Sequence, residues 1–317
     1  MSEIFELTTR PDETLFYSTG DHYDPRLGDI VHADTEHYQS SDLVILGCPH
    51  DEGVRRSGGR VGAADAPDAI REQFYKLTTF NIRKKIFDAG NIQLGSSLEE
   101  AHENQSRVVE QILRDGKRAI VLGGGNDISY ADGVAMSKVY GPEWWIGVNL
   151  DASLDVVKAE ERNNTTQFRQ LLDEGHLKPA YFYEAGYQSH LTSPFHYEYI
   201  REIGVHRISL EILRSRAEAD LELKEQIRAK FIGHSSSLST FFGFDMDVVR
   251  MADAPGTSNP SPLGLRAGEF IQLVKYAASL ANTKVIEFSE VNPKYDVDNR
   301  TTKLVAIGMH RFCTGVA

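Results

Sequence analysis

Short apolar runs alternate with longer amphipathic stretches almost throughout the chain. Several runs are apolar on both faces, which is typical of parallel strands that helices cover on either side. The amphipathic stretches carry apolar residues at helical spacing, and the first of them ends on a glycine. The predicted strands are 42–48, 118–124, 144–152, 180–186, 206–212, 240–248 and 284–291, and the predicted helices are 98–116, 221–233 and 267–282.

This alternation of strands and helices predicts an α/β fold with a mostly parallel, doubly wound sheet. No repeat, linker or low-complexity segment divides the sequence, so residues 41–317 are expected to form a single domain. Residues 1–40 are polar and irregular, and they are expected to form an N-terminal extension on the surface. Because open parallel sheets bind ligands at the carboxyl ends of their strands, the residues that follow each strand are the functional candidates.

The overall charge narrows the range of partners. The chain of 317 residues has a net charge of −12, from 34 basic and 46 acidic residues, which argues against non-specific binding to nucleic acid or to an anionic membrane. The first residues do not form a signal peptide, and no apolar run approaches the roughly 18 residues of a membrane span. A cytoplasmic protein is therefore expected, with Cys48 as a buried, reduced thiol rather than a disulfide partner of Cys313.

Polar side chains follow four of the predicted strands, and buried carboxylates among them are costly unless a cation meets them. A lone aspartate at a strand end is more often a helix N-cap, but the pair at 245 and 247 would share one strand face, and three strand ends carry acids. Two divalent ions held by these oxygens would lower the pKa of a bridging water. The residues concerned are Asn126, Asp151, Asp155, Asp245, Asp247 and Glu290.

Nucleotide binding is the competing interpretation of the glycine run at 123–125. The run continues as Asn126, Asp127 and Ile128, so the G-x-G-x-x-G pattern fails, and no GK[ST] follows for a P-loop. Dinucleotide or phosphate binding is therefore not expected.

Five ordered motifs resemble those of the arginase–agmatinase–formiminoglutamase family, the ureohydrolases, and the resemblance runs from about residue 42 to the C-terminus. The first of these motifs, at 47–71, most resembles its counterpart in the formiminoglutamase branch of the family. The motifs are GCPHDEGVRRSGGRVGAADAPDAIR (47–71), LGGGND (122–127), NLDASLD (149–155), FDMDVVRMADAPGTSNPSPLGL (244–265) and EVNPKYDVDNRTTKLVA (290–306).

The resemblance implies a three-layer α/β/α, arginase-like fold, a homo-oligomer (trimer or hexamer), and a pair of Mn²⁺ or Ni²⁺ ions. In this family the ions activate hydroxide for attack on a guanidino or formimino carbon, after which an amine leaves. By resemblance, Asp151 and Asp245 would bridge the ions, Asp155 would join the first ion and Asp247 the second. Glu290 would hold the guanidinium-like group of the substrate.

Two further assignments come from the same resemblance. Asp155 and Glu290 are the expected catalytic residues. The stretch at 163–172 resembles the formiminoglutamase substrate loop without one of its glycines, which makes Asn164 and Thr165 candidates for substrate binding.

The chain departs from the family at two ligand positions. Asn126 and Ser153 stand where the family has histidine ligands of the first and second ion. The amide oxygen and the hydroxyl would make the site all-oxygen and shift its preference towards Mg²⁺, Ca²⁺ or Mn²⁺. Losing one ligand commonly weakens metal binding tens-fold, on the order of 2–3 kcal/mol.

Three hypotheses follow from these departures. The first is a metal-dependent hydrolase of a guanidino, amidino or formimino compound, acting alone or in a hetero-oligomer. The second is a metal-deficient, non-catalytic paralogue that supports a catalytic relative in a hetero-oligomer. The third is a module that binds a guanidinium-type cation without turnover.

The other polar and aromatic residues receive structural interpretations. His176, His190 and His196 are expected on the surface or in loops. The acids and arginines of 51–56 are expected to form a salt-bridged turn. The core is expected to contain both tryptophans, Trp144 and Trp145, and the aromatic residues of 241–244.

Overall fold

A single mixed sheet organises the molecule. The computed structural model describes residues 4–215, 218–233 and 238–315. Within them the sheet has nine strands in the order β1-β3-β2-β4-β9-β8-β5-β6-β7, parallel except where β1 pairs with β3. The strands are β1 (Thr8–Thr9), β2 (Leu43–Cys48), β3 (Ile86–Ile92), β4 (Arg118–Gly123), β5 (Trp145–Leu150), β6 (Phe182–Tyr187), β7 (His206–Ser209), β8 (Ser239–Asp245) and β9 (Thr283–Ser289).

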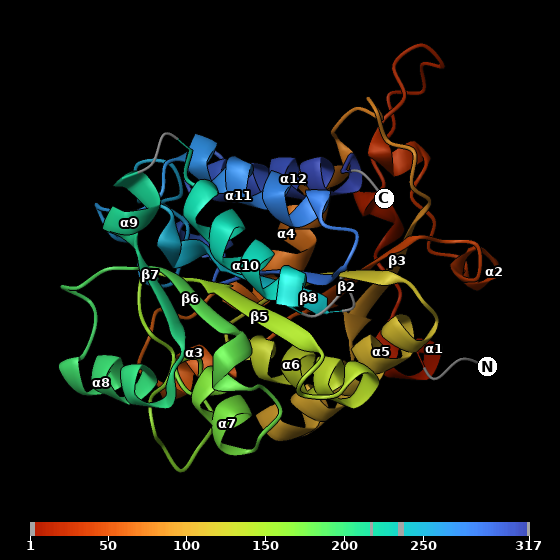
Figure 1. Cartoon of the computed structure of the whole chain (residues 1–317). Helices are drawn as coiled ribbons and strands as arrows, with labels where there is room; N and C mark the ends of the chain where they lie inside the picture. The colour runs from red at the N-terminus through yellow and green to blue at the C-terminus, as the bar shows by residue number, and fades with distance from the viewer. Residues whose placement is uncertain (1–3, 216–217, 234–237, 316–317) are drawn as a thin grey trace.

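Helices cover both faces of this sheet (Figure 1). On one face lie α4, α10, α11 and α12, and on the other lie α1, α5, α6, α7 and α8. The helices are α1 (Ile4–Leu7), α2 (Thr35–Tyr38), α3 (Glu52–Arg56), α4 (Ala66–Tyr75), α5 (Leu98–Arg114), α6 (Ile128–Tyr140), α7 (Gln167–Asp173), α8 (Pro194–Ile203), α9 (Leu210–Ser215), α10 (Leu221–Gly233), α11 (Ala267–Ser279) and α12 (Arg300–Cys313).

The core forms two apolar layers, one on each side of the sheet. Strands β2, β5, β6 and β8 are buried at every position, because alternate side chains face opposite helical layers. The predicted three-layer α/β/α fold with a mostly parallel sheet is therefore confirmed. Cys48 is free and buried, as expected, and Cys313 is free and buried as well.

Local sequence signals explain the ends of the longest helix, α5. The Ser97 side chain accepts a hydrogen bond from the Glu100 backbone N–H (3.1 Å), which caps the N-terminus. Gly116 follows the last turn with a φ of 74°, a conformation that glycine adopts without steric cost. The predicted helix at 98–116 is thus confirmed.

Several sequence-based expectations need correction. The strand predicted at 206–212 ends at Ser209, and α9 begins at the next residue. The strand predicted at 240–248 ends at Asp245 and continues as a 3-10 turn, Met246–Val248. Trp144 is not a core residue: 51% of its surface is exposed, whereas that of Trp145 is 1% exposed.

The first 40 residues contribute to the packed structure. Thr8 and Thr9 form β1, which pairs with β3 at the edge of the sheet. Ile4, Leu27 and Tyr38 are buried against the two apolar layers. No helix within the described part of the chain is long and apolar enough to cross a bilayer.

Candidate active site

Four neighbouring strands bring the predicted polar residues to one edge of the sheet. β4, β9, β8 and β5 are adjacent and parallel, so their carboxyl ends lie side by side. The residues that follow or end these strands are, in the same order, Asn126, Glu290, Asp245 and Asp151. The sequence therefore correctly placed these four residues at strand ends, and the sheet order makes them neighbours.

Ser153 lies between the two aspartates of the β5 loop. Its backbone N–H donates to Asp151 Oδ1 (3.0 Å), and its hydroxyl lies 3.5 Å from the same oxygen and 3.4 Å from Asp155 Oδ1. Both aspartates are buried, and Asp155 also accepts a 2.5 Å hydrogen bond from the Gln167 side chain. The serine thus bridges the two carboxylates with a hydroxyl where the ureohydrolase resemblance led us to expect an imidazole.

The Asn126 side chain is held by three partners. Its Nδ2 donates to Asp155 Oδ2 (2.7 Å), and its Oδ1 accepts from the hydroxyls of Ser129 (3.1 Å) and Ser289 (2.9 Å). In this orientation the nitrogen faces the carboxylates. Ligation of an ion through the oxygen, as predicted, requires the amide to turn over, which the two hydroxyls permit because they can also accept hydrogen bonds.

A 3-10 turn brings Asp245 and Asp247 into the site, whereas the sequence suggested that they share one face of a strand. Since the strand ends at Asp245, strand alternation does not align the two side chains. Instead, Asp245 Oδ1 accepts from the Asp247 backbone N–H (2.7 Å) and caps the 3-10 turn, while Asp247 Oδ1 accepts from the Asn259 N–H (2.8 Å). Both residues remain buried.

Glu290 is positioned by an unusual backbone conformation. Its φ is 60°, in the left-handed region, and its N–H donates to the Gly124 carbonyl (2.8 Å). Oε1 accepts from the Asn126 N–H (2.6 Å) and from Asn164 Nδ2 (2.9 Å), whereas the buried Oε2 has no hydrogen-bond partner among the described residues. Non-glycine strain of this kind occurs often at functional sites.

Burial raises the pKa of each acid in this site. Burial, with Glu184 nearby, raises the pKa of Asp155 to about 7, and burial raises that of Asp247 to about 7. Burial followed by the charge of Asp247 raises the pKa of Glu290 to about 8. The pKa values of Asp151 and Asp245 are also raised, by burial first and then by the charge of Asp155 on Asp151 and of Asp151 on Asp245.

The arrangement fits a divalent metal ion. Carboxylate oxygens of Asp151, Asp155 and Asp245 lie within 4.8 Å of one another, and the buried Oδ2 of Asp151 has no hydrogen-bond partner among the described residues. A set of buried carboxylates with raised pKa values and an unpartnered oxygen suits a hard or borderline cation such as Mn²⁺. These three residues would hold it, with Asp247 next to Asp245.

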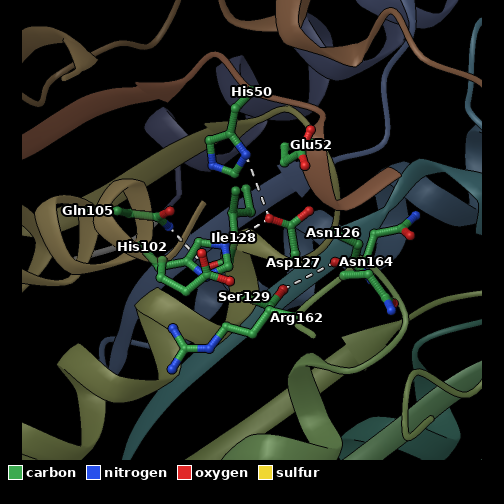
Figure 2. Close-up of polar contacts among 12 residues, drawn as sticks. His50, Glu52, His102, Gln105, Asn126, Asp127, Ile128, Ser129, Arg162 and Asn164 are labelled. Carbon is green, nitrogen blue, oxygen red and sulfur yellow. Dashed lines mark hydrogen bonds and ion pairs between the residues drawn. The ribbon is translucent and has the colours of Figure 1, made fainter. Parts of the chain in front are cut away.

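Sequence reasoning missed several polar residues in and around this site. Glu184 on β6 is fully buried and accepts a 3.0 Å bond from Asn149, and its negative charge acts on Asp155. The one sequence feature that marked Glu184 was the presence of an acidic residue within the apolar run 180–186. Gln167, which donates to Asp155, lies within the 163–172 stretch that resembles the substrate loop, but it was not itself predicted as a site residue. A cluster of His50, His102 and Asp127 lies beside Asn126 (Figure 2).

Of the two residues of the stretch 163–172 that were expected to bind substrate, Asn164 contacts the acidic site of the described structure and Thr165 does not. Asn164 contacts Glu290, while the backbone and hydroxyl of Thr165 bind Asn163 Oδ1 (2.9 and 2.7 Å). The expected salt-bridged turn at 51–56 is the short helix α3, in which Glu52 pairs with both Arg55 and Arg56.

The three histidines that were expected on the surface or in loops lie outside the carboxylate cluster. His190 is exposed in a turn, His176 lies after α7, and His196 is half-buried on α8. His196 lies on a helix because Pro194 begins α8, but its side chain is partly exposed, so the expectation of a surface or loop position is not contradicted.

A sheet of this topology, with helices on both faces and a cluster of acids at the carboxyl ends of four adjacent strands, defines an α/β protein with a metal-capable acidic centre. Residues 41–313 match the arginase family, and the chain belongs to that family. The resemblance noted from the sequence motifs is therefore confirmed.

Individual relatives refine this assignment. A formimidoylglutamase of Staphylococcus carnosus (strain TM300) is 35% identical over 271 residues, which cover 84% of each chain. The formiminoglutamase of Trypanosoma cruzi, solved with Mn²⁺, superposes with a TM-score of 0.84 at 31% identity, covering 92% of this chain and 98% of that one. The formimidoylglutamase of Bacillus subtilis shares the fold with a TM-score of 0.86 at 24% identity. The family and these relatives indicate a hydrolase of the ureohydrolase type.

Proposed function

We propose that the chain is a metal-dependent formimidoylglutamase, which hydrolyses a C–N bond of N-formimidoylglutamate. The observation that carries the proposal is the convergence of Asp151, Asp155 and Asp245 within 4.8 Å, beside a Glu290 whose second oxygen has no partner in the described part of the chain. The similarity to formimidoylglutamases over more than four fifths of the chain supports the choice of substrate.

The reaction requires water to add to the formimidoyl carbon. The C–N bond to the glutamate nitrogen then breaks, this nitrogen takes a proton, and formamide and glutamate are released. Divalent ions bound at the acidic centre would supply a water of lowered pKa and polarise it for attack. The protein residues have to place the formimidoyl carbon next to that water and stabilise the cationic form of the substrate.

Glu290 suits the second task. A protonated formimidoyl group is a planar cation with two nitrogens, and a carboxylate can accept hydrogen bonds from both. Asn126 and Asn164 fix the Glu290 carboxylate through Oε1, which leaves Oε2 to meet the substrate. A cation at this position also offsets the repulsion from Asp247 that raises the pKa of Glu290.

Asp155 is the proposed proton carrier as well as a ligand. Burial and the charge of Glu184 raise the pKa of Asp155 to about 7 in the metal-free protein, and a bound cation would lower it again, so the proposed role rests on the position of its free oxygen. Gln167 and Asn126 donate to Oδ2 and leave Oδ1 next to Ser153. The proton would therefore move at Oδ1.

The other hypotheses predict different behaviour from the purified chain. The relatives give no support to a non-catalytic paralogue or to a hetero-oligomer, although Asn126 and Ser153 motivated both. A cation-binding module would bind arginine, agmatine or guanidine without releasing product. Assembly as a homotrimer or homohexamer, which the family resemblance implies, is proposed as well and is tested by light scattering.

The decisive experiment is an assay of the purified full-length chain. After treatment with chelator and reloading with Mn²⁺, we expect release of glutamate and formamide from N-formimidoylglutamate, and much less hydrolysis of arginine or agmatine. Asp245→Asn should lower kcat/KM by about a hundredfold or more, because the site loses a ligand charge. Asp298→Asn is the matched control, because Asp298 is exposed and its φ of 53° suits asparagine.

Two results would overturn the proposal. Absence of turnover in a chain that binds Mn²⁺ would favour the cation-binding module. Equal turnover by the Asp245→Asn and Asp298→Asn variants would show that the carboxylate cluster is not the active site.

A further inference from the structure

A second cluster of metal-ligating side chains lies next to the carboxylate centre. His50 follows β2, His102 lies on α5, and Asp127 directly precedes α6. His102 Nε2 lies 2.8 Å and His50 Nδ1 lies 3.6 Å from Asp127 Oδ2, and one ligand atom from each residue lies within 4.8 Å of the others. Figure 2 shows the two imidazoles approaching Asp127 from different sides.

Burial leaves most polar atoms of this cluster without partners. The exposed fractions of His50, His102 and Asp127 are 6%, 1% and 1%. Among the residues that the structure describes, neither nitrogen of His50 makes a hydrogen bond, and the same is true of His102 Nδ1 and Asp127 Oδ1. Each buried, unsatisfied polar atom is unfavourable, so four of them in one cluster point to a missing ligand.

The donor set indicates the chemical class of that ligand. Two imidazole nitrogens and one carboxylate oxygen suit borderline cations such as Zn²⁺ or Co²⁺, with a fourth position for water. The 3.6 Å separation of His50 Nδ1 from Asp127 Oδ2 is already close to the spacing of two ligand atoms around a small tetrahedral ion. Burial lowers the pKa of His50, which favours the neutral imidazole that binds metals.

An ion can reach the cluster from the surface. His50 lines a pocket of about 440 Å³ together with Glu52 and Arg56, and His102 lines another of about 290 Å³ that includes Glu99. Glu52 and Glu99 are both paired with Arg56, so these pockets offer a route to the cluster and not an acidic charge that draws an ion in. The buried cluster therefore lies beneath two openings.

We propose that His50, His102 and Asp127 form a binding site for one Zn²⁺-class ion, separate from the Asp151, Asp155 and Asp245 centre. The ion would join the loop after β2, helix α5 and the start of α6, three elements that are far apart in the sequence. Because Asp127 adjoins Asn126, the ion would also stabilise the backbone N–H that binds Glu290.

Metal binding to the full chain tests this site when the carboxylate centre is disabled. In an Asp151→Asn/Asp245→Asn background, the chain should bind about one Zn²⁺ or Co²⁺, measured by plasma mass spectrometry after gel filtration. Bound Co²⁺ should show the strong visible absorption of a low-coordinate imidazole site. Zn²⁺ should raise the melting temperature.

His50→Phe is the decisive variant. The His50 side chain makes no hydrogen bond to any described residue, so a phenyl ring can fill its place without leaving a partner unsatisfied. We expect loss of the ion, of the Co²⁺ absorption and of the Zn²⁺-dependent rise in melting temperature. His176→Phe, at a partly exposed histidine outside the cluster, should retain all three.

His102→Gln provides a second test if His50→Phe fails to fold, because its amide can still donate to Asp127. Loss of the ion in this variant supports the site. Retention of the ion in either folded variant, or no Zn²⁺ in the parent background, would overturn the proposal and identify the cluster as a hydrogen-bonded group only.

Discussion

The Asn126 amide donates a 2.7 Å hydrogen bond to Asp155 Oδ2, so the residue at an expected metal-ligand position stabilises a neighbouring carboxylate. Gln167 donates to the same oxygen (2.5 Å). Two amides therefore support one buried acid that no described cation contacts directly. This pairing keeps the acidic centre assembled without relying on an imidazole at position 126.

Replacing Asn126 by histidine should strengthen metal binding at the carboxylate centre. An imidazole nitrogen is a better donor for Mn²⁺ and especially for Ni²⁺ than an amide, so we expect Kd to fall by about tenfold or more. Calorimetric titration of the chelator-treated chain measures the change. Asn126→Leu, which has a similar shape and no donor atom, is the matched control, and equal affinity of the two variants would contradict the prediction.

Gln167→Glu should destabilise the metal-free protein. The substitution replaces an N–H donor by a second carboxylate at hydrogen-bond distance from Asp155, so the free energy of unfolding should fall by about 1–3 kcal/mol. Urea denaturation with chelator present measures this loss. Gln170→Glu, on the same helix α7 but only partly buried, should change stability little. A similar loss in both variants would mean that the Asp155 contact is not the cause.

Hydrophobic patterning predicted the strands best where burial is complete. Strands such as β2 and β5 are apolar on both faces, and a charged residue directly after such a run is conspicuous. This contrast is sufficient to locate Asp151, Asp245 and Glu290 at strand ends from the sequence alone. The position of Asn126 relied on the family motif as well, because an asparagine after a glycine run is common in turns.

Other elements gave weak or misleading patterns for physical reasons. Strand β3 contains Asp88, whose charge is met by buried Arg71 from α4 (2.9 Å), so its apolar pattern is interrupted by a salt bridge that the sequence does not reveal. Helix α6 is buried from Ile128 to Met136 and lacks a polar face. The orientation of the Asn126 amide depends on Ser129 and Ser289, which only the fold brings together.

Gly124→Ala should be strongly destabilising, because the backbone of the β4 loop crosses the loop after β2 at this point. The Gly124 N–H donates to the Cys48 carbonyl (3.0 Å), and an added Cβ would overlap the backbone carbonyl of His50. Backbone atoms cannot yield as a side chain can, so a loss of about 3 kcal/mol or more is expected.

The matched control for that substitution is Gly268→Ala in the first turn of α11. The new Cβ at 268 meets no heavy atom within 4 Å, so helix propensity should make this variant equally or more stable, by up to about 1 kcal/mol. Thermal and urea unfolding of both variants distinguish the two sites. Comparable stability of the Gly124 and Gly268 variants would show that the β4 loop can move away from His50.

Asp132→Asn should reduce the loss of stability that rising pH causes. Burial raises the pKa of Asp132 to about 7, and burial with Asp132 nearby raises that of Glu287 well above its ordinary value. The folded state therefore binds more protons than the unfolded chain from about pH 4 upwards, so the free energy of unfolding falls as pH rises through this window. Asparagine can accept from Gln105 (2.8 Å in the native pair) and donate to Glu287, which removes one of the two titrating acids.

Urea denaturation at pH 5 and pH 8, with chelator present, measures the effect. The fall in unfolding free energy between these values should be smaller in Asp132→Asn by on the order of 1–3 kcal/mol. The carboxylate centre contributes equally to both proteins, so the difference isolates the Asp132–Glu287 pair. Asp298→Asn, at an exposed acid, should leave the pH dependence unchanged. An unaltered slope in Asp132→Asn would mean that this pair is already ionised in the folded protein.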